Sequence, residues 1–349
     1  MRILLGFTAS FALLLGASLT ASAQTAAGHA NRFHNTTKIA APAPLSYGVN
    51  IFARGTASYF NPDAITVDDH FVYVAYANNT AKNGSDGRPS TVVQYKRNGQ
   101  VDHIYSIIGH CDGMRLNPSS HQLWALVNND GNPAMYTIDP QTSAIKKYAF
   151  SSAPHGGGYD DVVFTNGQAF ISASNPTLNS SGINVFPAID RVTLSGSTAQ
   201  LTSVLEGDAS AFDITTQKVV KLNLVDPDSM SVDPAGDVIL VDQGGSELVA
   251  LSHAGTSSQM ATRLATGTQI EDPIWATNQH GVLFIVDGKA NAVYTATTQF
   301  IPGTVYVASP NDSGVASFVG TMDMTTGIIT PVLVGFRSPT GLLFVATQK

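Results

Sequence analysis

The chain is poor in cysteine and in charge. Cys111 is its single cysteine, so it cannot form an internal disulfide, and stability must come from burial of a core. Charged residues make up 12% of the chain and the formal net charge is -7. This balance argues against nucleic-acid or anionic-membrane partners, because both call for clustered Lys and Arg. Convincing helical periodicity is also missing after residue 23, which favours an all-β protein.

Long apolar runs are absent beyond the first residues. After residue 23, no segment approaches the run of about 18 apolar residues that a membrane-spanning helix needs. The chain begins with Arg2, a broken apolar stretch over 3–19 and a small-x-small site ending at Ala23, the pattern of a cleavable signal peptide. We therefore predict cleavage after Ala23, a secreted or periplasmic monomer, a flexible leader over 24–44 and one folded domain over 45–349.

One five-residue phrase recurs along the chain, with an aspartate at its head and apolar residues after it. Acid-headed copies begin at Asp63, Asp112, Asp160, Asp228 and Asp272, and a sixth copy begins at Thr340 without the acid. Each acid-headed copy is followed by a short polar turn and a second apolar run. Copies spaced by 44 to 68 residues and built from short strands predict a β-propeller, in which no blade can bury its faces alone.

The spacing predicts six blades, with five or seven as alternatives because two long gaps could hide a degenerate copy. The gaps contain strand-like stretches at 209–224 and 303–330, which we expect on loops or outer edges. The last copy ends close to the C-terminus and can supply only the innermost strand of its blade. Residues 45–60 would then supply outer strands of that blade, closing the ring and removing exposed sheet edges.

The aspartates form a predicted carboxylate ring. The first strand of each propeller blade lines the central channel, so the five acids should converge at one mouth. A second polar set ends the second strands and is expected at the same mouth: Asn78, Asn128 to Asp130, Asn175, Asp242 and Asp287. Crowded carboxylates must take up protons or bind a cation. Oxygen ligands favour Ca²⁺ or another hard divalent cation over Zn²⁺. The alternative is that each Asp caps a turn.

The phrase at Asp112, with the following run Leu-Trp-Ala-Leu, resembles a metal-ligand blade of the gluconolactonase (regucalcin-like) family. The segment Glu271-Asp-Pro-Ile-Trp275 is similar to the glutamate-ligand blade of that family, and Asp228 stands where the family has an asparagine ligand. The resemblance implies calcium ligands at Glu271, Asp112 and Asp228, in a ring that also holds Asp63 and Asp272. The blade phrase also resembles NHL-repeat propellers, most of which are binding proteins.

Three residues are candidate proton acceptors for catalysis. His110 and His155 shortly precede acid-headed copies, and paraoxonase-like propellers use histidine beside calcium; the alternative for each is an ordinary surface-loop histidine. Asp160 is the alternative base. These residues predict a metal-dependent hydrolase acting on a small lactone or ester. The alternatives are a non-catalytic NHL-like propeller that binds a peptide, glycan or protein partner, and a ring that holds only a structural ion.

Overall fold

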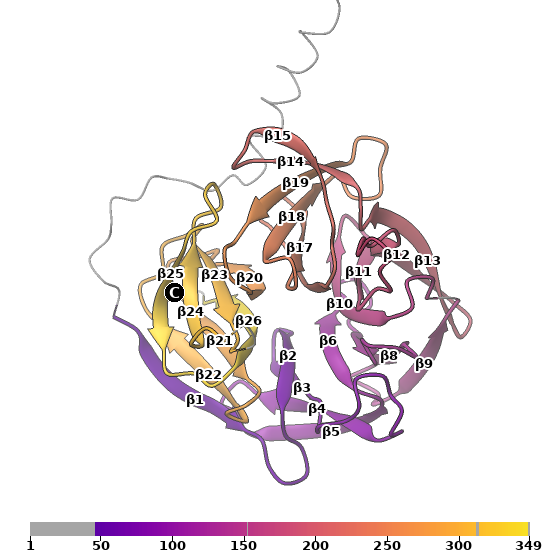
Figure 1. Cartoon of the computed structure of the whole chain (residues 1–349). Helices are drawn as coiled ribbons and strands as arrows, with labels where there is room; N and C mark the ends of the chain where they lie inside the picture. The colour runs from indigo at the N-terminus through magenta and orange to yellow at the C-terminus, as the bar shows by residue number, and fades with distance from the viewer. Residues whose placement is uncertain (1–45, 152, 312–313, 348–349) are drawn as a thin grey trace, which may run out of the picture.

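The computed structural model describes residues 46–151, 153–311 and 314–347, and these contain strands but no helix. The predicted signal peptide and leader lie outside the described residues. Four-stranded antiparallel units, here called blades, surround a central channel (Figure 1). The fold is the all-β propeller that the repeated phrase predicts. Among the described residues, no helix is long and apolar enough to cross a membrane.

Each blade begins with an inner strand that carries one copy of the phrase. Blade I comprises β2 (Pro62–Val67), β3 (Phe71–Tyr76), β4 (Pro89–Lys96) and β5 (Val101–Ile108). Blade II comprises β6 (Cys111–Leu116), β7 (Leu123–Val127), β8 (Ala134–Ile138) and β9 (Ile145–Phe150). Blade III comprises β10 (Gly158–Thr165), β11 (Gln168–Ser174), β12 (Pro187–Ser195) and β13 (Thr198–Glu206). The outer strands β9 and β13 also pair in parallel over a few residues, which joins blades II and III into one eight-stranded sheet.

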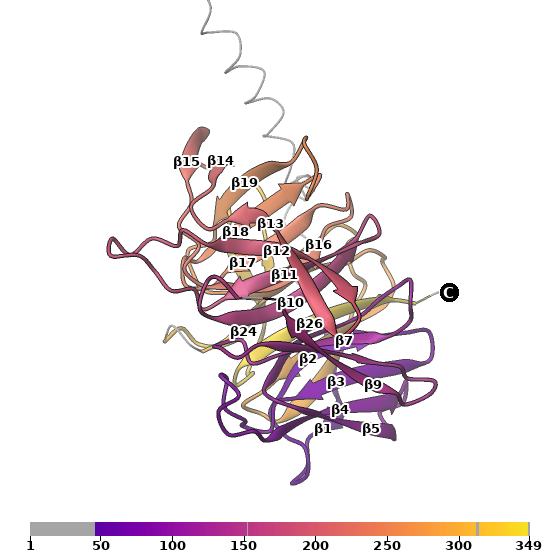
Figure 2. The same ribbon diagram turned by 90° about the vertical axis from the view of Figure 1, so that its right-hand side faces the viewer.

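Blade IV carries an additional hairpin on its outer edge. It comprises β16 (Pro227–Val232), β17 (Val238–Asp242), β18 (Glu247–Ser252) and β19 (Met260–Ala265). The hairpin consists of β14 (Ser210–Asp213) and β15 (Lys218–Lys221), and β14 pairs in parallel with β19. Both strands project at the rim of the molecule (Figure 2). The predicted insertion at 209–224 is therefore an outer-edge hairpin, held by Arg263, which bonds to Asp213 and Glu247.

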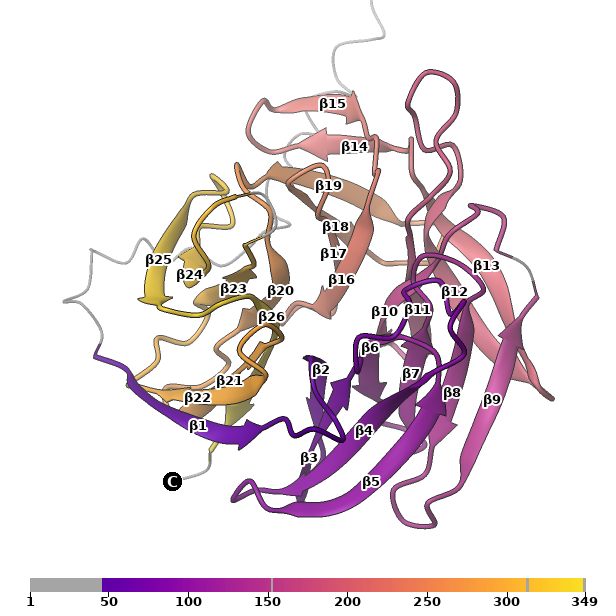
Figure 3. The ribbon, with the colours of Figure 1, turned by 60° about the horizontal axis from the view of Figure 1, so that its bottom comes forward.

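The last two blades are interleaved along the chain, because two strands of blade VI come between the first and second strands of blade V. Blade V comprises β20 (Glu271–Trp275), β23 (Val305–Ser309), β24 (Phe318–Met322) and β25 (Ile329–Val334). Blade VI comprises β26 (Pro339–Ala346), β21 (Gly281–Asp287), β22 (Ala292–Thr297) and β1 (Gly48–Arg54). The first and last strands of the described chain thus share one sheet, with β26 innermost and β1 outermost (Figure 3).

This exchange corrects two sequence-based expectations. We expected the run Val282–Val286 to pair with the phrase at Asp272, but β21 pairs with β26 and β22, and β20 pairs with β23 instead. The strands in the gap at 303–330 are therefore the rest of blade V and not an insertion. Strand periodicity could not reveal this, because it marks which residues are buried and not which inner strand they pair with.

The core is divided among the interfaces between neighbouring blades. Blades I and II bury one cluster that includes Tyr73 and Met114, and blades V and VI bury another that includes Tyr306 and Leu342. A further cluster joins blade I to blade VI through Phe284 and Tyr76. Each blade therefore depends on both neighbours for burial, and the ring is held without a disulfide because its only cysteine, Cys111, is buried and free.

Candidate functional site

A β-bulge recurs at the start of the repeated phrase in every inner strand. In blade I, Pro62 pairs with Tyr76 and Ile65 with Val74, so Asp63 and Ala64 together face a single residue of β3. Corresponding register shifts occur in the other inner-strand pairings. A bulge redirects side chains that strict alternation would send to opposite faces. Two successive residues of each inner strand can therefore face the channel.

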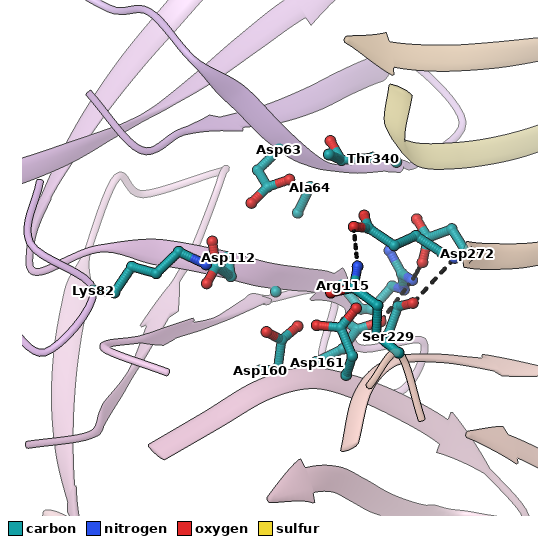
Figure 4. Close-up of a pocket in the computed structure, with 15 residues that line it drawn as sticks. Asp63, Ala64, Lys82, Asp112, Arg115, Asp160, Asp161, Ser229, Asp272 and Thr340 are labelled. Carbon is teal, nitrogen blue, oxygen red and sulfur yellow. Dashed lines mark hydrogen bonds and ion pairs between the residues drawn. The ribbon is translucent and has the colours of Figure 1, made fainter. Parts of the chain in front are cut away.

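These bulges line an acidic cavity of about 160 Å³ at one mouth of the channel (Figure 4). Its carboxyl groups come from five blades: Asp63, Asp112, Asp160, Asp161, Asp228, Glu271 and Asp272. Thr340 of blade VI takes the place of a sixth acid. The cationic residues of the lining are Lys82 and Arg115. Seven acids facing two cations leave a strong negative excess in a confined space.

Glycine lets adjacent inner strands touch at the cavity wall. A Cβ on Gly113 would lie 2.0 Å from the carbonyl oxygen of Asp160, and one on Gly341 would lie 2.5 Å from that of Asp63. Both contacts are with backbone, which cannot move aside as a side-chain end could. The second position of the phrase is therefore glycine in these blades because the neighbouring acid-bearing strand occupies the space of a side chain.

The acids interact in pairs across neighbouring blades. Burial, then the charge and hydrogen bond of Asp112, raise the pKa of Asp63 well above its usual range. Burial, then the charge of Asp228, likewise raise the pKa of Asp160. Burial and the charge of Glu271 raise the pKa of Asp228. Without a cation, these carboxyl groups hold protons more tightly than exposed ones do, because they are buried and repel one another.

His110 holds Asp112 in its charged form. Its Nε2 lies 3.0 Å from Oδ1 of Asp112, and its Nδ1 lies 2.9 Å from the carbonyl oxygen of Thr80. Although burial opposes ionisation, the charge and hydrogen bond of His110 lower the pKa of Asp112, and Asp112 in turn raises the pKa of His110. The other oxygen, Oδ2 of Asp112, is buried and receives no hydrogen bond from an N–H or hydroxyl donor of the described residues. Of the described carboxylate oxygens that line the cavity, it is the one that is buried without such a donor.

Arg115 crosses the floor of the cavity. Its Nη2 lies 2.8 Å from Oδ2 of Asp161, 3.2 Å from Oδ1 of Asp272 and 3.2 Å from the carbonyl oxygen of Met230. One guanidinium from blade II thus joins blades III, IV and V. Burial raises the pKa of Asp161 to about 6, although Arg115 opposes the shift. Arg115 therefore neutralises Asp161 and Asp272, the second of which belongs to the predicted ring.

Glu271 is oriented by a neighbour on blade IV. Nε2 of Gln243 donates a 2.6 Å hydrogen bond to Oε1 of Glu271. Glu271 precedes Asp272, which adopts a left-handed φ of 42° and accepts a hydrogen bond from the N–H of Leu342. This turn brings two successive acids of blade V to the channel, so Glu271 joins Asp228 at the wall while Asp272 faces Arg115.

All of the predicted metal-ligand residues line the cavity: Asp63, Asp112, Asp228, Glu271 and Asp272. The candidate base Asp160 does too, whereas His110 and His155 do not. Neither histidine lies on the surface: His155 is fully buried and its Nε2 lies 2.7 Å from the carbonyl oxygen of Gly158. Burial lowers the pKa of His155, so it packs as a neutral ring.

The second polar set is not part of the cavity lining, contrary to our expectation, although Nδ2 of Asn129 donates a 3.4 Å hydrogen bond to Oδ2 of Asp160. Asn128 accepts a hydrogen bond from the N–H of His110, and Asp242 accepts one from the N–H of Asp226. Asn78 and Asp287 accept similar bonds from backbone N–H groups just before the inner strands of their own blades. These side chains therefore cap the loops that enter the inner strands, which is the turn-capping role weighed as the alternative for the acids.

Sequence reasoning missed the two cations and Gln243. Lys82 lies in the loop between β3 and β4, and its side chain points toward Asp112 (Figure 4). Arg115 could have been noticed, because it is a cation at a phrase position where other copies have small or apolar residues. Among the described residues, no three His, Cys, Asp or Glu side chains already form a metal cage.

Comparisons with known proteins agree on architecture only. No protein-family model and no curated sequence matches the chain. Solved structures that resemble it include a Bacteroides caccae protein of unknown function (10% identity, 81% of this chain and 86% of that chain, TM-score 0.48). Others are a Pseudomonas aeruginosa periplasmic gluconolactonase (14%, 82% and 88%, 0.46) and a Staphylococcus aureus virginiamycin B lyase (11%, 76% and 96%, 0.41).

Proposed function

We propose that the acidic cavity binds one hard divalent cation, with Ca²⁺ favoured, in a protein that acts outside the cytoplasm. The observation that carries this proposal is the excess of seven carboxyl groups over Lys82 and Arg115 in a cavity of about 160 Å³. Like charges at such density must be protonated or bind a cation. Carboxylate and amide oxygens are the ligands that Ca²⁺ prefers.

The donor chemistry of the cavity fits such an ion. Oδ2 of Asp112 receives no hydrogen bond from an N–H or hydroxyl group of the described residues, and Asp160, Asp228 and Glu271 face the same space. Asp272 is less suited to binding the ion, because Arg115 and the N–H of Leu342 already occupy its two oxygens. These groups do not form a finished cage, so binding must draw carboxylates together, with loss of the protons that they share.

We further propose that the same cavity hydrolyses a small lactone or ester. A bound divalent cation would polarise the carbonyl and lower the pKa of water. Asp160 is the proton acceptor of choice, because it lines the cavity whereas neither histidine does. As water adds to the carbonyl carbon, Asp160 takes its proton, and the ester C–O bond then breaks with that proton passing to the leaving alkoxide. His110 keeps Asp112 ionised and does not touch the substrate.

Calorimetric titration of the purified, chelator-treated protein with CaCl₂ tests cation binding. Wild type should bind one ion, and Asp228→Asn should bind it at least about tenfold more weakly because one charged ligand is lost. Asp69→Asn, an exposed acid in the β2–β3 turn, is the matched control and should behave as wild type. Absence of saturable binding to wild type would remove the proposal.

Hydrolysis is tested with a panel of aldonolactones and aryl esters, each with and without chelator. We expect turnover that the chelator abolishes and that Asp160→Asn reduces by about 10² or more, the usual contribution of a general base. Cation binding without turnover on any member of the panel would leave the ion with a structural role.

A second function is favoured by one observation. The cavity already holds a guanidinium and an ammonium group against its carboxylates, so it could equally receive a basic side chain of a peptide or protein partner. In that case a stoichiometric partner would be recovered from the native envelope fraction on wild type and not on Asp228→Asn.

A further inference from the structure

The backbone of Lys82 is fixed above the acidic cavity by the neighbouring blade. It lies in the loop that connects β3 to β4, and its carbonyl oxygen accepts a 3.1 Å hydrogen bond from the N–H of Asp130. The next carbonyl, that of Asn83, accepts a 3.1 Å bond from Nδ2 of Asn132. Both donors belong to the β7–β8 loop of blade II. The root of the Lys82 side chain is therefore held in place rather than free to wander over the surface.

The side chain of Lys82 extends from this root into the cavity mouth, toward Asp112 (Figure 4). The charges that act on its ammonium group are, from the strongest, those of Asp112, Asp160 and Asp63. Within the described part of the chain, however, no carboxylate lies within 4.0 Å of its Nζ, and the residue as a whole is exposed to solvent. Lys82 is thus attracted by several acids and tightly bonded to none of them.

Arg115 provides the contrast within the same cavity. Its guanidinium is bonded to two carboxylates and to the carbonyl oxygen of Met230, from three different blades. Those bonds fix it as part of the wall. An ammonium group on a flexible four-carbon stem, by comparison, is strongly hydrated and can leave by rotating its own side chain.

We propose that Lys82 is a tethered counter-ion of the acidic cavity, and that a cation enters by displacing its ammonium group. The proposal rests on the cation-binding function proposed above and adds what sets the affinity. With Lys82 present, an arriving divalent cation meets a like charge, or must first push it into solvent. The side chain stabilises the empty cavity and weakens cation binding by the same interaction, because the two cations compete for Asp112, Asp160 and Asp63.

Calcium titration of Lys82→Met tests this competition. The substitution keeps the length of the stem and removes its charge. We expect CaCl₂ to bind about tenfold or more tightly than to wild type, because a repulsive charge has been removed from a partly desolvated site. Lys82→Arg, which keeps the charge, should stay close to wild type. Lys96→Met is the matched control, since Lys96 is exposed and pairs with Asp102 outside the cavity, at 3.8 Å.

The outcomes separate this proposal from the proposed function. Calcium binding to wild type with equal or weaker binding to Lys82→Met overturns the role of Lys82 and leaves the cation site standing. Binding to Lys82→Met alone supports the role of Lys82 and removes the cation function of wild type. Binding to neither overturns both. Lys82→Gln repeats the measurement with a polar neutral side chain, and thermal melting of the calcium-free proteins verifies that each variant is folded.

Discussion

The two mouths of the channel are built from the same six strands and differ in chemistry. One mouth is the acidic cavity, whereas the other is a cavity of about 250 Å³ lined largely by apolar side chains, such as Val163, Val232, Ile274 and Leu343. Arg115 and Asp272 line both and separate them. The head of the repeated phrase faces one mouth and its tail the other. Packing alone explains the apolar mouth, but it does not explain why five blades place carboxylates at the other.

The strongest disruption of the acidic mouth should come from Gly113→Ala. The new Cβ would lie 2.0 Å from the carbonyl oxygen of Asp160, so the inner strands of blades II and III must separate. We expect a loss of about 4 kcal/mol or more in the free energy of unfolding, or failure to fold. Urea denaturation measures this. Gly48→Ala is the control, since its new Cβ would lie 3.3 Å from the hydroxyl oxygen and 3.9 Å from the carbonyl oxygen of Thr297, and near-equal losses would show that the close approach at Gly113 is unimportant.

Replacing Arg115, which helps to separate the two mouths, should have the next largest effect. Arg115→Met leaves Asp161 and Asp272 facing each other without their cation, which should reduce the free energy of unfolding by about 3 kcal/mol at pH 8. Lowering the pH should restore part of this loss, because the two carboxyls can then be neutralised by protonation. Arg54→Met, at an exposed position, is the comparison. A loss independent of pH would point to packing rather than charge.

The pH dependence of stability should report buried carboxyl groups both at the acidic mouth, as Asp161, and elsewhere in the ring, as Asp190 and Asp242. Burial raises the pKa of Asp161 and Asp190 to about 6 and that of Asp242 to about 7. The folded state therefore holds protons that the unfolded state has lost, and the stability that these groups contribute below about pH 4 should be lost as pH rises toward 7. Calcium should flatten only the part of this decline that the cavity acids contribute, which melting curves across pH with and without calcium would reveal.

Asp242→Asn provides an internal check on that decline. The amide oxygen can still accept the hydrogen bond from the N–H of Asp226, but the group no longer titrates. The slope of stability against pH should become shallower in this variant. An unchanged slope would show that Asp242 does not contribute to it.

The smallest effect is expected from the residue that supports Asp112. His110→Asn removes the contact between Nε2 and Oδ1 of Asp112, which should reduce the free energy of unfolding by about 1 kcal/mol and weaken calcium binding. His103→Asn, at an exposed position on β5, is the control. Unaltered calcium affinity in His110→Asn would show that Asp112 is ionised without its histidine.

The inner strands, and the gathering of the acids at one mouth of the channel, could be predicted from the sequence because the phrase repeats at one position of each blade. It could not predict the second polar set correctly, since Asn128 and Asp242 have the same residue types whether they cap a loop or face a ligand. The bulges escaped notice because an extra residue leaves no mark in a polar-apolar pattern. Lys82 escaped because its position depends on contacts with blade II that lie far away in the sequence.

The exchange of strands between blades V and VI affects how the protein folds during its synthesis. After β20 the chain leaves blade V to form β21 and β22, returns for β23 to β25, and supplies β26 last. During synthesis on the ribosome, β21 therefore emerges before its pairing partner β26, which is synthesised about fifty residues later. Blades I to IV can assemble one after another during synthesis, whereas the last two must form together with the first strand, as one late and cooperative step.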